Sequence, residues 1–291
     1  MSSIAGNPQA DQSALPIAGL RGPGPFPARL GKYGAVLRMS IANNLAYAGE
    51  VVLRSFFLVV LVYVFLQLWH VTYGVLGTPT IGGYNIGQMI WYFAFAEAII
   101  LSAPRLAQRI DQEVKSGDLA YRLNKPYSYI LYMAAEYTGE RFVRFVLNLA
   151  ITIGLCLLLV GPIPFTAGGL AGTGLLVAGA WAIDFLALCT LGLLAFWVED
   201  SYAFILIYSR FLLLLGGTML PLNIFPDWAR QIVEWLPFGF IVYGPARSFV
   251  SFDSMIFWDM LLKQSITIVI MGALVSLVFR RGARQVNING G

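Results

Sequence analysis

Long apolar runs recur six times along the chain and determine the expected architecture. A helix of about 20 apolar residues crosses the hydrocarbon core of a bilayer, and roughly 17 residues is the lower limit. The six runs cover residues 51–71, 86–103, 142–160, 170–198, 203–222 and 257–279. The pattern predicts an all-α membrane protein with six transmembrane helices, and this even number puts both termini on the same side.

The N-terminal part of the chain follows two other patterns. Residues 1–28 are rich in Ser, Gly, Pro and Ala, so we expect a disordered tail there. Residues 29–48 predict an amphipathic helix in the membrane interface, because apolar side chains recur at three- and four-residue steps: Leu30, Tyr33, Leu37, Ile41, Leu45 and Ala48. The frayed start of the first span is the alternative. A single transmembrane domain is expected over residues 29–285, with 286–291 as a second tail.

The composition excludes most soluble functions. Hydrophobic residues make up 58% of the 291 positions and charged residues 12%, whereas a soluble domain carries about 25% charged residues. Too few charges remain to cover a water-facing surface, which excludes a soluble enzyme, a nucleic-acid-binding protein and a disordered scaffold. We expect the lipid bilayer, and no nucleic acid, among the partners of this chain.

The basic residues predict the orientation in the membrane. Fourteen Lys and Arg residues lie before the first run, between the second and third runs or at the start of the third, or after the sixth. The segments on the opposite side carry three, namely Arg230, Arg247 and Lys263. Because cytoplasmic segments of membrane proteins are enriched in Lys and Arg, both termini and both tails are expected to be cytoplasmic, in an inner or plasma membrane.

The sequence contains no recognisable catalytic motif. His70 is the single histidine, and Cys156 and Cys189 both lie in apolar runs, so neither a zinc site nor a Cys–His pair is expected. No G-x-x-x-x-G-K-[ST] phosphate loop is present. We therefore expect no catalytic residue, no metal and no cofactor on this chain.

Three ionisable residues inside the apolar runs are candidate functional residues, namely Glu97, Asp184 and Arg210. An unpaired charge at this depth is unfavourable by several kcal/mol. A helix rises about 1.5 Å per residue, which puts Glu97 about 9 Å and Arg210 about 10 Å from the cytoplasmic edge, but Asp184 about 20 Å from it. We expect a Glu97–Arg210 ion pair, which either fixes helix register or belongs to a transport path.

A long charged segment separates the second and third runs. Residues 103–125 predict a helix to about Lys115, a break at Ser116-Gly117, and a helical turn capped by the carboxylate of Asp118. A simple connection between helices needs only about 2–8 residues. The length and the mixed charge of this segment indicate a structured cytoplasmic element.

The segment between the last two runs is also more than a loop. Four prolines, Pro226 and Pro237 among them, divide residues 221–256 into short pieces. A ten-residue helix spans about 15 Å, half of a bilayer, so interfacial or re-entrant helices are expected. Trp228, Trp235 and Tyr243 are expected at the level of the lipid headgroups, where aromatic residues are enriched.

These two segments resemble parts of a known family. Residues 113–126, which read Glu-Val-Lys-Ser-Gly-Asp-Leu-Ala-Tyr-Arg-Leu-Asn-Lys-Pro, resemble a signature loop of type-2 ABC exporter permeases. The motif Pro-Leu-Asn-Ile-Phe-Pro-Asp-Trp at 221–228, followed by Leu-Pro-Phe at 236–238 and Tyr-Gly-Pro at 243–245, resembles the outer segment of that family. Together with the span count, the resemblance covers about residues 29–285.

The resemblance implies the permease of an ATP-driven exporter. Two permeases, identical or homologous, would form a dimer around the substrate pathway, and two copies of a separate ABC ATPase subunit would bind ATP and Mg. Lipophilic or amphipathic compounds are the implied cargo. Segment 103–125 would couple the permease to the ATPase, with these residues in the contact: Arg109, Glu113, Lys115, Gly117, Asp118, Arg122 and Lys125.

Two alternatives from other classes stay open at the level of sequence. A self-powered secondary transporter would require inverted repeats with broken helices, and no convincing internal repeat is present. An integral-membrane enzyme acting on lipids would require convergent acidic or nucleophilic groups at one membrane edge. Glu199 and Asp200 form the one adjacent acidic pair.

Overall fold

The computed structural model describes residues 26–289, with the backbone alone at residues 26–30, 51, 54 and 285–289. The expected disordered tail at residues 1–28 therefore lies almost wholly outside the described residues. In the C-terminal tail expected at 286–291, the last helix continues to Asn289.

Residues 26–289 form an all-helical structure with one isolated bridge, between Ile81 and Tyr84. The long helices are α1 (Phe26–Ala46), α2 (Ala48–Leu76), α3 (Ile86–Leu101), α6 (Tyr129–Leu159), α7 (Ala167–Leu193) and α12 (Ser254–Asn289). The shorter helices are α4 (Leu106–Lys115), α5 (Asp118–Leu123), α8 (Tyr202–Leu215), α9 (Asp227–Val233), α10 (Pro237–Ile241) and α11 (Tyr243–Val250). Two 3-10 turns complete the list, η1 (Leu194–Phe196) and η2 (Leu222–Ile224).

Five stretches of helix are long and apolar enough to cross a membrane. They are Ala48–Leu76, Ile86–Lys115, Tyr129–Leu159, Ala167–Phe196 and Ser254–Arg284, the second of which comprises α3 and α4. The fifth apolar run of the sequence yields only the 14-residue helix α8. This helix is about 21 Å long, short of a hydrocarbon core of about 30 Å. It ends at Gly216-Gly217, where Gly217 adopts a positive φ of 76°.

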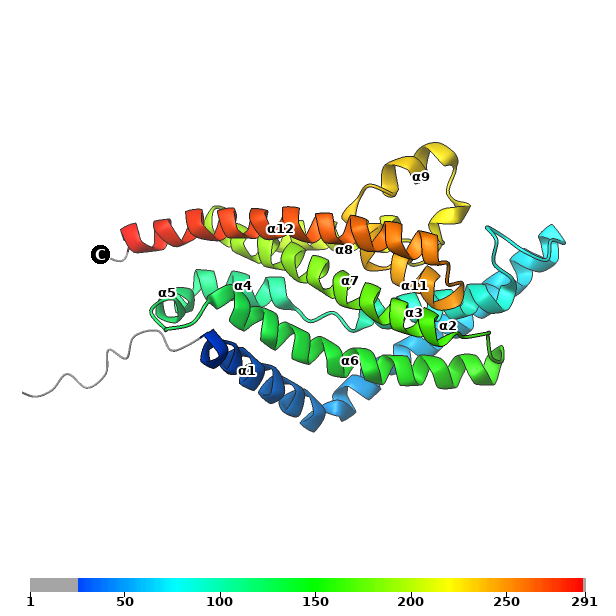
Figure 1. Ribbon diagram of the computed structural model, residues 1–291, viewed down its shortest axis with the longest axis horizontal. Helices are drawn as coiled ribbons and strands as arrows, with labels where there is room; N and C mark the ends of the chain where they lie inside the picture. The colour runs from blue at the N-terminus through cyan, green and yellow to red at the C-terminus, as the bar shows by residue number, and fades with distance from the viewer. Residues whose placement is uncertain (1–25, 290–291) are drawn as a thin grey trace, which may run out of the picture.

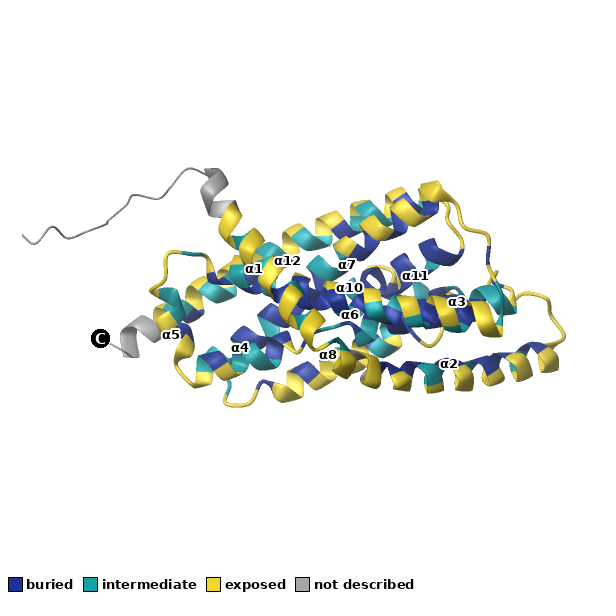
Figure 2. Cartoon of the chain, turned by 90° about the horizontal axis from the view of Figure 1, so that it is seen from below, coloured by how far each residue is buried: buried dark blue, intermediate teal, exposed yellow. Residues whose placement is uncertain are grey.

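Most of the long helices run along one axis, and α3 packs between α2, α6 and α11. In Figure 1, α4, α5 and the C-terminal end of α12 lie at one end of the bundle, and α9 lies near the other. All eleven residues from Met89 to Ile99 of α3 are buried, which matches an apolar helix surrounded on every side. In Figure 2, by contrast, α2 shows one buried and one exposed face along the edge of the bundle.

Helix α1 packs on α6, and this contact uses much of its predicted apolar face. Tyr33, Leu37 and Ile41 are partly buried, whereas Leu45 is exposed. The Tyr33 hydroxyl accepts a hydrogen bond from the backbone N–H of Ser128, 2.9 Å away, and Ser40 Oγ donates to the carbonyl of Glu136 at 2.8 Å. Most of the helix predicted at residues 29–48 therefore forms as α1, and part of its apolar face packs on protein.

The outer segment folds back into the bundle. Helices α10 and α11 pack against α7, and α11 also packs against the buried helix α3. Gln264 of α12, which is 1% exposed, donates hydrogen bonds to the carbonyls of Leu176 and Phe240 at 3.0 and 2.9 Å. One buried side-chain amide thus joins α12 to α7 and α10 by hydrogen bonds, as polar side chains do between membrane helices.

The close approach of α1 to α6 depends on Gly139 and yields a testable prediction. A Cβ at this position would lie 2.7 Å from Ser40 Cβ and 2.9 Å from the backbone oxygen of Leu37. The Gly139→Ala variant should therefore lose about 1–3 kcal/mol of stability through overpacking. A thermal melt in detergent measures this loss.

Gly154, on the same helix, provides the matched control. Nothing lies within 4 Å of a Cβ built there. Gly154→Ala should keep or slightly raise the melting temperature, because Ala favours a helix interior over Gly by about 1 kcal/mol. Equal losses in both variants would show that α1 does not need this close contact.

Candidate functional site

The charged segment predicted at 103–125 has the predicted local structure. Helix α4 ends at Lys115, Gly117 adopts a left-handed φ of 80°, and α5 begins at Asp118. Glycine adopts this backbone conformation without the steric penalty of a side chain, so Gly117 makes the sharp turn possible. The helix, break and short helix expected from the sequence are confirmed.

Apolar side chains anchor this segment on the bundle. Leu106, Ala107 and Ile110 of α4 and Leu119 of α5 are at most 2% exposed and join a buried cluster with residues of α6 and α7. The backbones of α4 and α7 approach closely, since a Cβ on Gly192 would lie 2.7 Å from Ile110 Cβ. The segment is therefore held as a rigid projection of the bundle.

Two of the charges predicted to contact a partner form bonds within the segment and to α6. Glu113 is buried and accepts from Arg122 Nη2 at 3.1 Å and from the Tyr129 hydroxyl at 2.9 Å. Burial alone would lower the pKa of Arg122, but the adjacent Glu113 carboxylate and the Tyr132 hydroxyl raise it overall. These residues hold α5 against α6.

Arg109 likewise binds to α6. Its Nη1 lies 2.9 Å from Glu136 Oε1, and its Nη2 lies 3.1 Å from Glu140 Oε2. Glu140 also accepts from Arg144 at 2.6 Å. The side chains of Arg109, Glu113 and Arg122 are thus part of the internal structure, a role that sequence spacing did not reveal.

The remaining predicted residues, Lys115, Gly117, Asp118 and Lys125, lie together with Tyr121 on an exposed surface, which we call the coupling tip. Tyr121 is 69% exposed, and Lys125 Nζ lies 4.6 Å from the centroid of its ring. The predicted cap by Asp118 is wrong, because Gly117 is the residue before α5 and Asp118 accepts from Ser116 Oγ at 2.8 Å. Lys115 pairs with Asp111 at 2.8 Å along α4.

A second polar cluster lies inside the bundle and joins four helices. Arg141 of α6 and Asp184 of α7 are each 1% exposed, with Arg141 Nη1 2.5 Å from Asp184 Oδ2. The Tyr137 hydroxyl donates to the same Asp184 oxygen at 2.8 Å, and the Tyr208 hydroxyl of α8 donates to Oδ1 at 2.6 Å. Arg141 Nη2 also reaches the carbonyl of Ile99 in α3, 3.4 Å away.

The Glu97–Arg210 ion pair predicted from depth is wrong. Arg210 is exposed on α8, while Glu97 is buried in α3, and the two form no ion pair in the part of the chain that the structure describes. Asp184 pairs with Arg141 instead. The sequence predicts a cytoplasmic position for Arg141, because this residue precedes the third apolar run. In the structure, α6 begins at Tyr129, twelve residues before Arg141.

The sequence carried one signal for the Arg141 cluster. Ser128 caps α6, accepting from the N–H of Leu131. A helix started there carries Arg141 about 18 Å along its axis and puts Tyr137 on the same face, four residues before it. No local signal predicts that Tyr208 joins them.

The aromatic residues predicted for the outer surface divide into two groups. Trp228 and Trp235 are 70% and 78% exposed, as expected for side chains that face headgroups. The prediction for Tyr243 is wrong, because this side chain is buried. Its hydroxyl donates to Asn223 Oδ1 and accepts from Arg247 Nη1 at 2.8 Å. Pro226 precedes α9, and Pro237 is the first residue of α10, a position that tolerates proline because no helical N–H partner is lost.

Comparison with known families assigns the chain. A family model described as ABC-2 family transporter protein matches residues 57–290, most of the chain. The chain belongs to the ABC-2 transporter family. No curated protein matches it. As an ABC-2 transporter protein, the chain is a multi-pass membrane protein and a permease subunit that associates with an ATPase subunit. The matched residues include the coupling tip, the buried cluster and the outer segment, but not α1.

The buried ion pair of this ABC-2 transporter protein yields a second prediction. Removing one partner of a buried pair costs about 3–5 kcal/mol, whereas replacing both with apolar residues is often near neutral. Arg141→Met and Asp184→Leu should each lower the melting temperature and expression, and the double variant should recover most of the loss. A double-mutant cycle in detergent measures the coupling.

Arg210→Met is the control for this cycle. Arg210 is exposed on α8, so its replacement should leave the melting temperature of the isolated chain nearly unchanged. Strictly additive losses of Arg141→Met and Asp184→Leu would mean that the two side chains do not interact.

Proposed function

We propose that this chain is the transmembrane permease of an ATP-driven exporter. Two permeases, identical or homologous, form the substrate pathway as a dimer, and two copies of a separate ABC ATPase subunit power it. The permease itself carries no cofactor, because ATP and Mg bind to the ATPase. Family membership supports the ATPase partner, and the coupling tip supports the place where it binds.

The coupling tip is the single observation that carries this proposal. It lies at one end of the bundle, where α12 also ends, and it combines two lysines, an aspartate and an exposed tyrosine (Figure 1). Such mixed polar surfaces suit reversible contacts, in which charge complementarity directs the encounter. The anchored face of α4 makes the tip a projection that an ATPase can move together with the helices beneath it.

Helix α6 is the proposed route from the tip to the interior. Arg109 and Arg122 connect the α4–α5 segment to α6 through Glu140 and through Glu113 and Tyr129. Arg141 follows Glu140 directly and pairs with Asp184 of α7. A displacement of α4 therefore shifts charged residues of α6 that face two other helices. ATP binding then favours the arrangement of these helices that makes the better contact with the ATPase.

The proposed topology has six crossings and two cytoplasmic termini. Helix α8 is short, but its two ends are tied to opposite parts of the bundle. Ser201, just before α8, donates to Asp111 of α4 at 2.6 Å, and the carbonyl of Gly217, just after it, accepts from Tyr92 near the start of α3. This arrangement supports α8 as the sixth crossing, which places α4, α5 and the C-terminus on the cytoplasmic side.

Lipophilic or amphipathic compounds are the proposed cargo. The secondary transporter and the lipid-modifying enzyme are weaker alternatives. The family supports an ATPase-powered mechanism, and the acidic pair that an enzyme would use is partly engaged, because Asp200 Oδ1 accepts from the backbone N–H of Tyr202 at 2.8 Å. The described residues contain no cluster of three or more potential metal ligands.

The ATPase contact can be tested by charge reversal on the coupling tip. The triple variant Lys115→Glu, Asp118→Lys, Lys125→Glu should stay in the membrane but bind the ATPase at least about tenfold more weakly, since a close interfacial charge pair contributes about 1.5 kcal/mol or more. Co-purification and a binding titration with the ATPase subunit measure this. Glu113 is left intact because its loss would disturb Arg122 and Tyr129.

Charge reversal at the opposite end is the control. Asp227→Lys with Arg230→Glu changes an exposed pair on α9, whose side chains lie 3.1 Å apart. This variant should bind the ATPase as the unchanged protein does. If the α9 variant loses the ATPase while the coupling-tip variant keeps it, the proposed coupling surface and orientation are both wrong.

Cysteine labelling tests the orientation independently. Ser116→Cys and Arg284→Cys should react only from the cytoplasmic side, and Thr80→Cys and Ser251→Cys only from outside, because all four positions are exposed at the ends of the bundle. The native Cys156 and Cys189 are buried, so the unchanged chain should give little background. Labelling of Ser251→Cys from the cytoplasm would contradict the six-crossing topology.

A further inference from the structure

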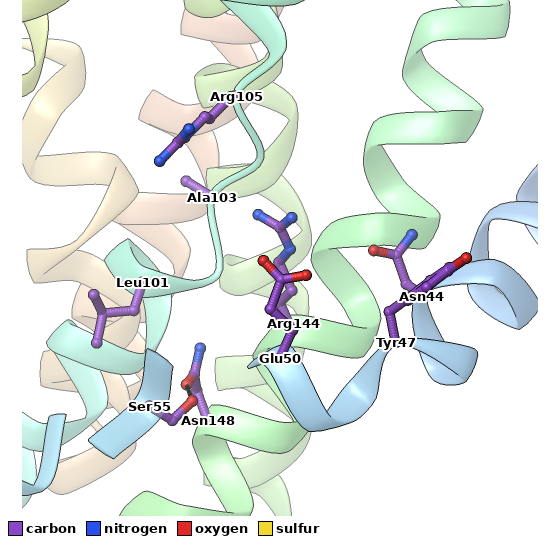
Figure 3. A pocket seen from close by; sticks show the side chains of 9 residues that line it. All are labelled: Asn44, Tyr47, Glu50, Ser55, Leu101, Ala103, Arg105, Arg144 and Asn148. Carbon is purple, nitrogen blue, oxygen red and sulfur yellow. Dashed lines mark hydrogen bonds between the residues drawn. The ribbon is translucent and has the colours of Figure 1, made fainter. Parts of the chain in front are cut away.

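A polar cavity lies where α1 meets α2, beside the end of α3 and the middle of α6. Its volume is about 260 Å³. Its polar lining comes from four parts of the chain, as Figure 3 shows: Asn44, Glu50, Ser55, Arg105, Arg144 and Asn148. The charges assigned to the coupling tip and to the Arg141 cluster do not line it.

One hydrogen-bond donor without a partner lies beside this cavity. Arg144 Nη2 bonds to Glu140, but Arg144 Nε is buried and has no hydrogen-bond partner. Ser55 Oγ donates to Asn148 Oδ1 at 2.6 Å, which orients that amide, and Figure 3 shows the nitrogen of Asn148 turned away from Ser55. A buried N–H without an acceptor is unfavourable by about 1–3 kcal/mol, so Arg144 carries an unmet donor next to the cavity.

Counted over its lining residues, the cavity has one more positive than negative charge, and Glu140, outside the lining, pairs with Arg144 at 2.6 Å. The cavity is lined by two guanidinium groups, those of Arg105 and Arg144, and by one carboxylate, that of Glu50. Glu50 already interacts within the chain. Arg105 is exposed and forms no ion pair with any residue between 26 and 289 whose side chain is described. An anion with several acceptor oxygens fits this arrangement, since arginine binds phosphate with two parallel hydrogen bonds.

The surface beside the cavity favours an anion that carries hydrocarbon chains. Directly after Glu50, α2 exposes Leu53, Phe56 and Phe57, which are 76%, 67% and 57% exposed. These residues belong to a helix that is long and apolar enough to cross a membrane, so their exposed faces offer an apolar surface to acyl chains. A phosphate in the cavity would thus place an attached acyl chain along α2, with the headgroup at the level where the span begins.

We propose that this cavity binds the phosphate of an anionic phospholipid in the leaflet at the α4–α5 end of the bundle. Basic pockets between transmembrane helices on the cytoplasmic side are sites where acidic headgroups bind. The site needs no ATPase, so it stands independently of the coupling role. The proposed orientation decides only which leaflet supplies the lipid.

A lipid titration of the purified full-length chain in zwitterionic detergent tests the site. Phosphatidylglycerol in mixed micelles should raise the melting temperature in a saturable way, and phosphatidylcholine should not. Arg105→Gln and Arg144→Gln should each shift the half-saturating concentration of phosphatidylglycerol upward by about tenfold, the expected effect of losing one charged hydrogen bond. Arg38→Gln, an exposed arginine of α1 outside the cavity, should leave it unchanged.

Several outcomes would overturn the proposal. Equal stabilisation by phosphatidylcholine, or an unchanged phosphatidylglycerol response in Arg105→Gln, would remove the anionic headgroup from the cavity. Full stabilisation by free glycerol phosphate would assign the cavity to a soluble phosphate compound instead of a lipid. If Arg144→Gln does not fold because Glu140 loses a partner, Arg105→Gln decides alone, since that side chain has no ion pair to lose in the described structure.

Discussion

The ion pair between Arg141 and Asp184 is the interaction on which the arrangement of the helices depends most. Both side chains are 1% exposed, and each alone would be a buried charge in an apolar bundle. Two tyrosine hydroxyls and a backbone carbonyl provide further hydrogen bonds, so the pair joins α6 and α7 to α8 and α3. Because the pair is satisfied only when these helices lie in one register, it penalises slipped arrangements that hydrophobic contact alone would tolerate.

The α4–α5 segment and the buried pair share α6 as their support. On the surface of α6, Glu136 and Glu140 hold Arg109, and inside the bundle the next residue, Arg141, holds Asp184. One helix therefore connects a projection at the end of the bundle to the charges at its centre. This arrangement is what a permease needs when the energy arrives from a separate ATPase, as family membership implies for this chain.

The end of the bundle near α9 holds its buried segments together with polar side chains such as tyrosines, whereas its ion pairs, for example Arg230–Asp227, are exposed. Tyr92 donates to the carbonyl of Gly217, and Tyr243 bonds to Asn223 and Arg247. The hydroxyl groups satisfy backbone and side-chain partners of a segment that proline prevents from forming one continuous helix. Short helices can therefore lie inside the bundle without the large free-energy cost of backbone groups that lack hydrogen-bond partners.

The sequence by itself determined what depends on local pattern. Apolar runs located five of the long membrane helices, Gly117 and its neighbours located the break between α4 and α5, and the motif at residues 113–126 indicated the family that the comparison confirmed. These features require only neighbouring residues, because hydrophobic length, positive φ and capping act within a few positions.

Only the tertiary structure decided which charges meet. Depth in the membrane, counted from the ends of the apolar runs, predicted that Glu97 pairs with Arg210. However, α6 begins well before its apolar run, so Arg141 lies inside the bundle and pairs with Asp184. The same holds for Glu113 and Tyr243, which look like surface residues in the sequence and are buried by packing. Pairing depends on where each helix starts, how far it is offset and which face its neighbours cover, and these are properties of the assembled bundle that no single segment contains.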